Sequence, residues 1–214
     1  MRTAIIGGSG RTARLLTNIL SSRGGDIVST TRSLDHRTDL PTAGVDYVVL
    51  DLEHDTSADD WAFLAGADAV VFAAGAGYGS STRQKRAVDL DGAVRAIAAA
   101  TAYRVPRFVM ISSMGADASL TGSDPFSEYL RLKGEADDSL TRTTLDWTIV
   151  RPSGLRGGPG TGSIRVGRNL GGGSLARIDL AHVIARVLED RSTIGVVFDV
   201  TEGNQLIATA TLTP

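Results

Sequence analysis

Tyr129 and Lys133 are four residues apart, a spacing that places both side chains on one face of a helix. A tyrosine exchanges protons poorly near neutral pH unless its phenolate is stabilised, and a lysine one helical turn away provides that stabilisation. Ser113, at the end of an expected strand, adds a hydroxyl that can bind a substrate oxygen. The three side chains could therefore relay a proton to or from a small carbonyl or alcohol. The alternative is chance spacing, with Tyr129 packed under a loop and Lys133 in solvent.

A glycine-rich turn near the start of the chain separates a short apolar run from a helix-forming segment. The run 4–6 precedes Gly7 and Gly10, and a helix is expected from about Arg11. Glycine lets the chain turn where a side chain would clash, and the helix start offers unpaired N–H groups to a phosphate. In this order, the spacing Gly7-x-x-Gly10-x-x-Ala13 predicts a dinucleotide-binding loop. The alternative is an ordinary strand-to-helix turn that is rich in glycine.

The end of the second expected strand, Asp26–Thr31, carries Arg32 where an acid would select NAD. In folds of this kind, an acid at that place binds the ribose 2′-hydroxyl, whereas an arginine accommodates the 2′-phosphate of NADP. Arg11 could reach the same phosphate, and two guanidinium groups suit a phosphate better than one. The first acid after the strand is Asp35. We therefore expect NADP(H) as the cofactor, unless both arginines are simply solvated.

Apolar runs alternate with segments of helical periodicity along the whole chain. Beyond the second strand, strands are expected over 45–50, 68–74, 107–112, 145–150 and 195–200. Helices are expected over 11–23, 57–64, 88–102, 127–140 and 179–188, the last with Asp179 as its N-cap. Residues 78–86 are expected to form a polar loop, and residues 154–173 an irregular glycine-rich segment that acts as a flap or is poorly ordered.

This alternation predicts the α/β class: a doubly wound, Rossmann-like parallel sheet with helices on both faces. We expect a single NAD(P)-binding domain over residues 1–214, with a small C-terminal appendage on the substrate side. Ligands bind at the carboxyl ends of the strands in such sheets. The candidate cofactor-binding residues gather there, and Asp51 either binds the adenine amino group or serves as a turn residue. They are Gly7, Ser9, Gly10, Arg11, Thr12, Arg32, Asp51, Leu52, Ala73, Ala74, Gly75, Ser112, Lys133 and Pro152.

Composition narrows the function classes. The 214 residues are 42% hydrophobic with a net charge of −2 and no basic block, so neither disorder nor a nucleic-acid partner is expected. There is no cysteine, and the three histidines (His36, His54 and His182) have no ligand spacing, so no metal is expected. The first strand begins at residue 2, which leaves no room for a signal peptide. No apolar run approaches bilayer length. We expect a cytoplasmic protein without a membrane partner, and the alanine-rich helix from Val88 could support a homodimer.

Together, the glycine spacing, Ser112-Ser113, Tyr129-x-x-x-Lys133 and Thr148-Ile-Val-Arg-Pro152 resemble the short-chain dehydrogenase/reductase superfamily. The short chain and the glycine spacing resemble its atypical branch, the small NmrA-like and epimerase-like NAD(P)-binding proteins. The resemblance implies NADP(H) on the glycine loop, Ser113 as the hydroxyl that orients the substrate, Tyr129 as the acid/base and Lys133 as its partner. It also assigns to Asp89 a catalytic position that is an asparagine in the superfamily. An ionised aspartate accepts hydrogen bonds but donates none.

Three functions follow from these residues. The first is an NADP(H)-dependent oxidoreductase or epimerase-like enzyme that acts on a small carbonyl or alcohol. The second is a catalytically weak protein that binds NADPH as a redox sensor, which Asp89 favours because the resemblance implies incomplete catalytic sets in the atypical branch. The third is an NADPH-dependent flavin or quinone reductase, in which the protein supplies mostly orientation.

Overall fold

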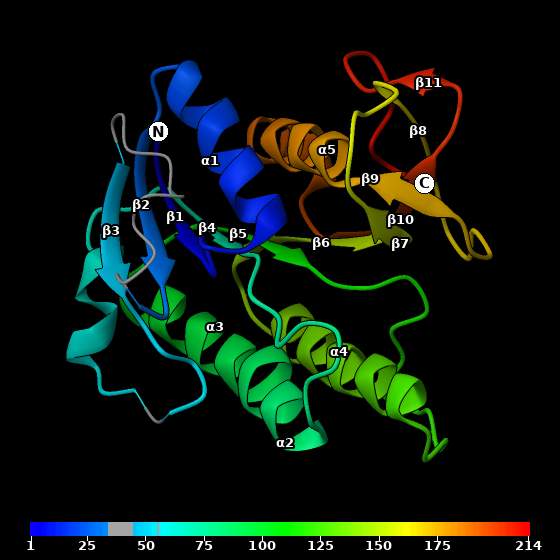
Figure 1. Ribbon diagram of the computed structural model, residues 1–214. Helices are drawn as coiled ribbons and strands as arrows, with labels where there is room; N and C mark the ends of the chain where they lie inside the picture. The colour runs from blue at the N-terminus through cyan, green and yellow to red at the C-terminus, as the bar shows by residue number, and fades with distance from the viewer. Residues whose placement is uncertain (34–44, 55) are drawn as a thin grey trace.

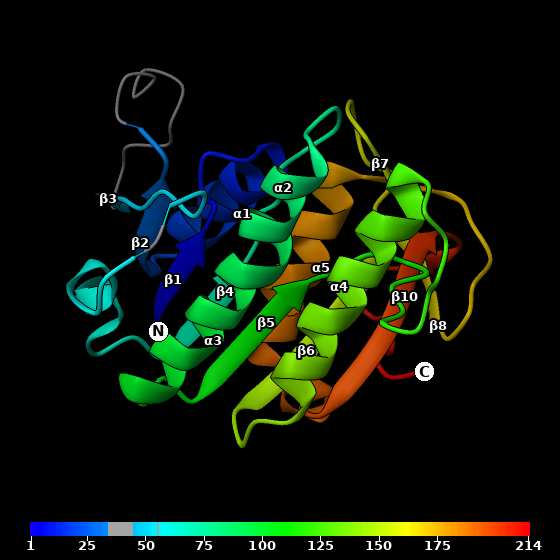
Figure 2. The ribbon, with the colours of Figure 1, turned by 90° about the horizontal axis from the view of Figure 1, so that it is seen from below.

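A computed structural model describes residues 1–33, 45–54 and 56–214 of the chain. It has three layers: a central sheet with helices on both of its faces (Figure 1). Helices α1 (Arg11–Ser22) and α5 (Arg177–Glu189) cover one face. Helices α3 (Gly92–Ala102) and α4 (Pro125–Thr141) cover the other face (Figure 2). The doubly wound α/β fold predicted from the alternating pattern is confirmed.

The sheet has nine strands in the described part of the chain, in the order β11-β8-β10-β6-β5-β4-β1-β2-β3. The run from β10 to β3 is parallel, whereas β8 and β11 are antiparallel to their neighbours. The parallel strands are β1 (Arg2–Ile6), β2 (Asp26–Thr31), β3 (Val45–Val49), β4 (Ala69–Phe72), β5 (Arg107–Ile111), β6 (Asp146–Pro152) and β10 (Val196–Glu202). All seven agree with the expected strands to within two residues at each end.

The central strands are apolar runs because both of their faces are covered by helices. All four residues of β4 are fully buried, as are Ala4, Ile5 and Ile6 of β1. One set of core residues packs under α3 and α4 and includes Phe72 and Phe108. A second set packs under α1 and α5 and includes Ile5 and Phe198. The carboxyl ends of the parallel strands are therefore held at one edge of a rigid sheet.

The segment 154–173, expected to be irregular, is partly ordered into strands. β7 (Gly154–Arg156) pairs with β9 (Ser174–Ala176) in a separate two-stranded sheet. β8 (Ser163–Gly167) joins the main sheet and pairs with β10 and with β11 (Gln205–Leu206). The prediction of an irregular segment was wrong at these strands because partners far along the chain supply their hydrogen bonds, while glycine content reflects only local preference.

Two local predictions also need correction. The N-cap of α5 is Ala176, and Asp179 lies inside the first turn. The buried Asp179 carboxylate accepts hydrogen bonds from the backbone N–H groups of Thr161 (2.8 Å) and Gly162 (3.1 Å), and so anchors the 154–173 segment. Residues 78–86 are not all loop, because Ser81 caps a short helix, α2 (Thr82–Lys85), through a capping box.

The helix expected from Val88 begins earlier and has an irregular start. After α2 comes a π-helical turn, η3 (Arg86–Asp91), and only then α3. π-helical turns are rare in proteins, but those that do occur often lie at functional sites. Two 3-10 helices, η2 (Asp59–Leu64) and η4 (Arg191–Thr193), also lie in the described part of the chain. The turn η3 carries Asp89, which is 3% exposed, toward the end of the sheet where the glycine loop lies.

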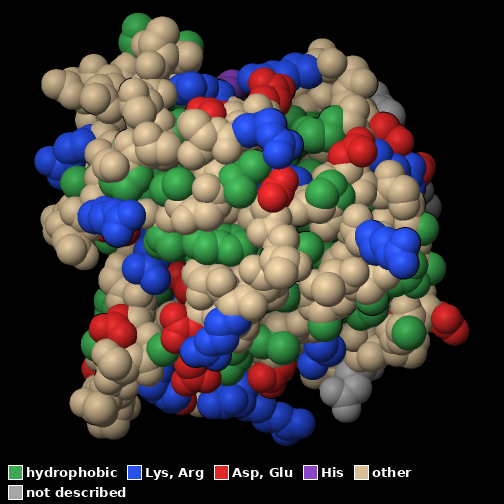
Figure 3. Space-filling view, turned by 180° about the vertical axis from the view of Figure 1, so that it is seen from behind, with side chains coloured by type: hydrophobic (Ala, Val, Ile, Leu, Met, Phe, Trp, Pro, Cys, Tyr) green, Lys and Arg blue, Asp and Glu red, His purple; other side chains and the backbone are tan. Residues whose placement is uncertain are grey.

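The surface mixes charges of both signs. On the face shown in Figure 3, basic and acidic side chains are interspersed with hydrophobic ones. Within the ranges that the structure describes, none of the helices is sufficiently long and apolar to span a bilayer.

Candidate active site

The glycine loop lies between β1 and α1 and brings the backbone close to strand β4. Gly7 has a φ of +83°, and a Cβ atom there would lie 2.5 Å from the Cα of Ala74. The Gly7 N–H donates to the Thr30 hydroxyl (3.0 Å), which ties the loop to β2. Gly10 is the N-cap of α1, whose first turn contains no acidic residue and whose N-cap makes no side-chain hydrogen bond. The first N–H groups and the positive dipole end of α1 therefore face an open edge.

Asp89 and Lys133 form a buried ion pair across this edge. The Lys133 Nζ atom is 4.0 Å from Asp89 Oδ1, and the residue is 2% exposed. Lys133 also donates to the carbonyl oxygen of Ile111 (3.0 Å), and Asp89 accepts from the N–H of Ala76 (3.1 Å). Burial raises the pKa of the Asp89 carboxyl above its ordinary value, and the Lys133 ammonium partly offsets this effect. Backbone hydrogen bonds thus fix both the Lys133 ammonium and the Asp89 carboxyl group in the lining of the pocket.

Tyr129 and Ser113 line the same pocket as Lys133 and Asp89. α4 carries both Tyr129 and Lys133, so the predicted shared face is present. The Tyr129 ring stacks with that of Phe126, at 6.2 Å between ring centroids, and the phenol makes no hydrogen bond within the described ranges. The Ser113 hydroxyl donates to the carbonyl oxygen of Met114 at 3.3 Å. Both hydroxyls are only partly buried, so a ligand in the pocket can contact them.

Beneath Ser113, a buried network fixes the end of β5 to α4. Ser112 donates to Asp137 Oδ2 (2.9 Å), and Arg151 binds the same oxygen through Nε and Nη2, each at 2.9 Å. Burial raises the pKa of the Asp137 carboxyl, and the Arg151 guanidinium and the Ser112 hydroxyl oppose the rise. The Ser112 hydroxyl is therefore engaged by Asp137 within the protein, whereas the Arg151 side chain also lines the pocket.

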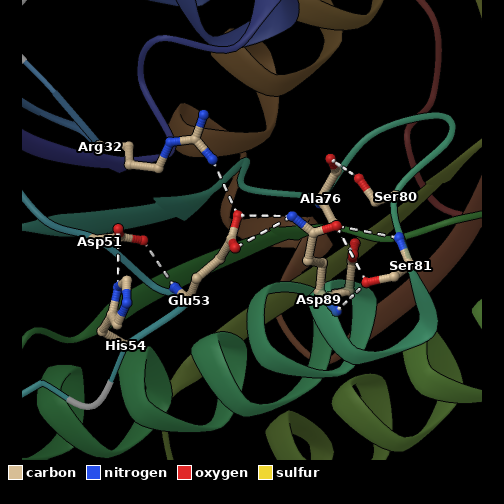
Figure 4. Close-up of polar contacts among 9 residues, drawn as sticks. Arg32, Asp51, Glu53, His54, Ala76, Ser80, Ser81 and Asp89 are labelled. Carbon is tan, nitrogen blue, oxygen red and sulfur yellow. Dashed lines mark hydrogen bonds and ion pairs between the residues drawn. The ribbon is translucent and has the colours of Figure 1, made fainter.

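A second polar cluster lies at the ends of β2 and β3 (Figure 4). Arg32, whose side chain is 70% exposed, contacts Glu53 through Nη1 at 3.0 Å. The other terminal nitrogen of Arg32 points away from Glu53. Glu53 also accepts from the amide of Gln84, at 3.2 and 3.4 Å. Asp51 accepts a hydrogen bond from the Glu53 N–H (2.9 Å) and pairs with His54 (3.1 Å). These local contacts are those of a turn residue.

The structure brings most of the predicted site residues to one pocket. Those that line it are Gly10, Arg11, Thr12, Ala73, Ala74, Gly75, Asp89, Ser112, Ser113, Tyr129, Lys133 and Pro152. Gly7 lies in the glycine loop but does not line the pocket. Arg32 and Asp51 belong to the second cluster, and Leu52 follows Asp51 in the chain. Ser9 is exposed on the loop. Asp35 and His36 lie outside the described residues, within which no group of three or more His, Asp or Glu side chains could hold a metal ion.

The loop geometry fits a dinucleotide. A side chain at Gly7 would collide with Ala74, two residues beyond β4, so only glycine lets the loop pass this close to that backbone. The start of α1 and Gly75, which has no side chain, border one track along the strand ends that reaches Tyr129. A dinucleotide binds along such a track in Rossmann-like folds. The fold and the site therefore define a nucleotide-binding protein of the Rossmann type.

Comparison with known proteins agrees with this class. The chain belongs to the NAD(P)H-binding family, whose model matches residues 7–191. It is 33% identical over 212 residues to a Bacillus subtilis protein named the uncharacterized sugar epimerase YhfK, covering 98% of both chains. A Schizosaccharomyces pombe protein, the UPF0659 protein C216.03, is 30% identical and covers 94% of this chain and 89% of its own.

Solved structures share the whole fold. A Bacillus halodurans protein, provisionally described as an NAD-dependent epimerase/dehydratase, superposes with a TM-score of 0.88 at 36% identity and 97% coverage of both chains. The oxidoreductase ylbE from Lactococcus lactis gives a TM-score of 0.85 at 28% identity, covering 97% of this chain and 94% of its own. The resemblance to atypical short-chain dehydrogenases/reductases is thereby confirmed.

Four residues of the site were not predicted from the sequence: Glu53, Asp137, Arg151 and Arg177. Asp137 carried a usable signal, because Tyr129, Lys133 and Asp137 follow one another at intervals of four along a helix. Arg151 precedes Pro152 in the motif Thr148-Ile-Val-Arg-Pro152, and this pattern indicates no role for its guanidinium. Glu53 and Arg177 carried no local signal, since their importance depends on neighbours that are distant in the sequence.

Proposed function

We propose that this protein is an NADP(H)-dependent oxidoreductase or epimerase-like enzyme that acts on a small carbonyl or alcohol. The observation that carries the proposal is the single pocket that joins the glycine loop to Ser113, Tyr129 and Lys133. Membership of an NAD(P)H-binding family supports a nicotinamide cofactor. The names of the Bacillus subtilis and Lactococcus lactis relatives, an epimerase and an oxidoreductase, support this class of chemistry.

In the proposed mechanism, the residues of this chain bind the substrate oxygen and move its proton. The Ser113 hydroxyl orients the oxygen, and the Tyr129 phenol donates the proton or takes it back. Lys133 holds a positive charge one helical turn below the phenol, fixed by Ile111 and Asp89. A bound nicotinamide supplies or accepts the hydride. Phe126 and Leu130 line the pocket beside Tyr129.

The direct test is the substitution Tyr129→Phe, which removes the hydroxyl and keeps the ring packed against Phe126. In a screen of small aldehydes, ketones and sugars with NADPH, the wild type should turn over a carbonyl substrate. The Phe variant should lose most of the turnover, by roughly 100-fold or more, and keep its NADPH affinity. The proposed role of Tyr129 is wrong if the variant retains full activity.

A second function, sensing of NADPH, is favoured by one observation. Asp89 stands where the superfamily places an amide donor, and its carboxylate is already engaged by Ala76 and Lys133. We infer that a protein with such a site could bind NADPH without turnover. This alternative predicts tight binding of one redox form over the other, because a ligand with equal affinity for two states shifts no equilibrium. Titration with NADPH and NADP separates the two functions.

A further inference from the structure

Two arginines at the rim of the pocket have no hydrogen-bond or ion-pair partner among the described residues. Arg11 begins α1 and Arg177 begins α5, and these helices pack side by side on one face of the sheet (Figure 1). Both residues line the pocket. Within the part of the chain that the structure describes, neither guanidinium makes an ion pair or a hydrogen bond. Other arginines, such as Arg151 and Arg156, are paired with carboxylates.

The surroundings of the two arginines favour an anion. Arg177 is half-buried, and burial lowers the pKa of its guanidinium, which the neighbouring positive charge of Arg11 lowers further. Asp179 lies in the first turn of α5, but both of its carboxylate oxygens accept hydrogen bonds from the backbone N–H groups of Thr161 and Gly162. Asp199, which also lines the pocket, accepts from the N–H of Leu170 (3.1 Å). Two like charges therefore lie together with the positive ends of two helices and no compensating carboxylate contact.

We propose that Arg177, together with Arg11, forms a subsite for a phosphate group. A guanidinium presents a planar fork of donors that matches phosphate oxygens, and a divalent phosphate neutralises two such forks. The phosphate can come from two sources: the pyrophosphate of the dinucleotide, or a phosphate carried by the substrate. The inference extends the proposed function, because it adds a residue on α5 to the dinucleotide and substrate pocket.

The test compares Arg177→Gln and Arg11→Gln with Arg168→Gln. The control removes one positive charge from an exposed position that does not line the pocket. NADPH affinity is measured by fluorescence titration, and inorganic phosphate binding to the NADPH complex by calorimetry. Because Arg177 makes no ion pair or hydrogen bond within the described ranges, its loss should leave the melting temperature unchanged, and an unchanged melting temperature shows that the variant is folded.

If the dinucleotide supplies the phosphate, the two pocket variants should each bind NADPH roughly 10-fold or more weakly, and the control should not. If the substrate supplies it, NADPH affinity should stay constant while the pocket variants lose the phosphate binding of the wild-type complex. The subsite is refuted if neither measurement changes, or if Arg168→Gln causes an equal loss. A wild type that binds no dinucleotide would instead refute the proposed function, and phosphate binding to the free protein would still test the subsite.

Discussion

At the scale of single residues, we expect the opposite charges of Arg32 and Glu53 to set the preference between NADPH and NADH. Arg32 can bind a 2′-phosphate only beside the Glu53 carboxylate, 3.0 Å from its Nη1 atom. The substitution Arg32→Ala should weaken NADPH binding by about 10- to 100-fold and leave NADH binding nearly constant, because a charge-assisted hydrogen bond to the phosphate is lost. Glu53→Gln should strengthen NADPH binding by up to about five-fold, because a like charge beside the phosphate is removed.

The six affinities can be measured by titration of NADPH and NADH into the wild type and both variants. Arg168→Gln is a suitable control, since it removes a positive charge from an exposed position that does not line the pocket. The expected NADP preference is wrong if the wild type binds NADH as tightly as NADPH, or if Arg32→Ala weakens both to the same extent.

Asp89 provides a test based on pH. Its folded-state pKa lies above the ordinary value of 3.8 because burial penalises the carboxylate more than Lys133 stabilises it. Folding therefore favours the protonated acid, and the stabilisation is lost as pH rises from about 3.8 through the folded-state pKa. Asp89→Asn has no such transition. The free energy of unfolding of the variant, relative to the wild type, should increase between pH 4 and pH 7.

Urea unfolding at several pH values measures this difference. Asp137 has a raised pKa for the same reason, but it is present in both proteins and cancels. A difference that is independent of pH, or that decreases as pH rises, would contradict the assigned burial of the Asp89 charge.

Single residues could be recognised from the sequence only when spacing along one element revealed them. Tyr129 and Lys133 were found because four residues are one helical turn. Arg32 was found because the end of the second strand has a known place in the fold. Glu53 and Arg177 were missed because their neighbours, Arg32 and Arg11, lie 21 and 166 residues away in the sequence, and only the fold brings them near.

At the scale of elements, Gly134 determines how closely α4 approaches the loop that carries Ser113. A Cβ atom at this position would overlap the backbone of Ala118 and lie 2.7 Å from the Cα of Asp117. Alanine in a helix is intrinsically better than glycine by about 1 kcal/mol, but overlap with backbone typically costs 1 to 3 kcal/mol or more. The overlap should win, so we expect Gly134→Ala to lower the free energy of unfolding by about 1 to 2 kcal/mol.

Gly157→Ala is the matched control, because no atom lies within 4 Å of its added Cβ and its φ is not positive. Denaturant unfolding of both variants measures the difference. Equal stability of the two variants, or a more stable Gly134→Ala protein, would show that the loop yields easily and that the approach of α4 is not constrained.

Most elements could be predicted because their hydrophobic pattern is local. The buried run of β4 and the apolar face of α1 indicate a strand and a helix without knowledge of the rest. The segment 154–173 could not be predicted, because β7 and β8 form only when β9, β10 and β11 pair with them. The turn η3 was also missed, since the sequence pattern of a π-helical turn differs little from that of the helix it precedes.

At the scale of the whole molecule, one sheet extends from β11 at one edge to β3 at the other, and a single domain over residues 1–214 stays a prediction. The protein should therefore unfold in one cooperative transition.

If NADPH binds only the folded state, a concentration 100-fold above its Kd adds about 2.7 kcal/mol of stability. For a chain of this length, that should raise the melting temperature by roughly 5 to 10 °C. Calorimetry of the wild type and of Tyr129→Phe should show one peak and the same shift, because the phenol is assigned to proton transfer and not to cofactor binding. Two separate transitions would contradict the single domain, and a peak that NADPH does not move would contradict the cofactor.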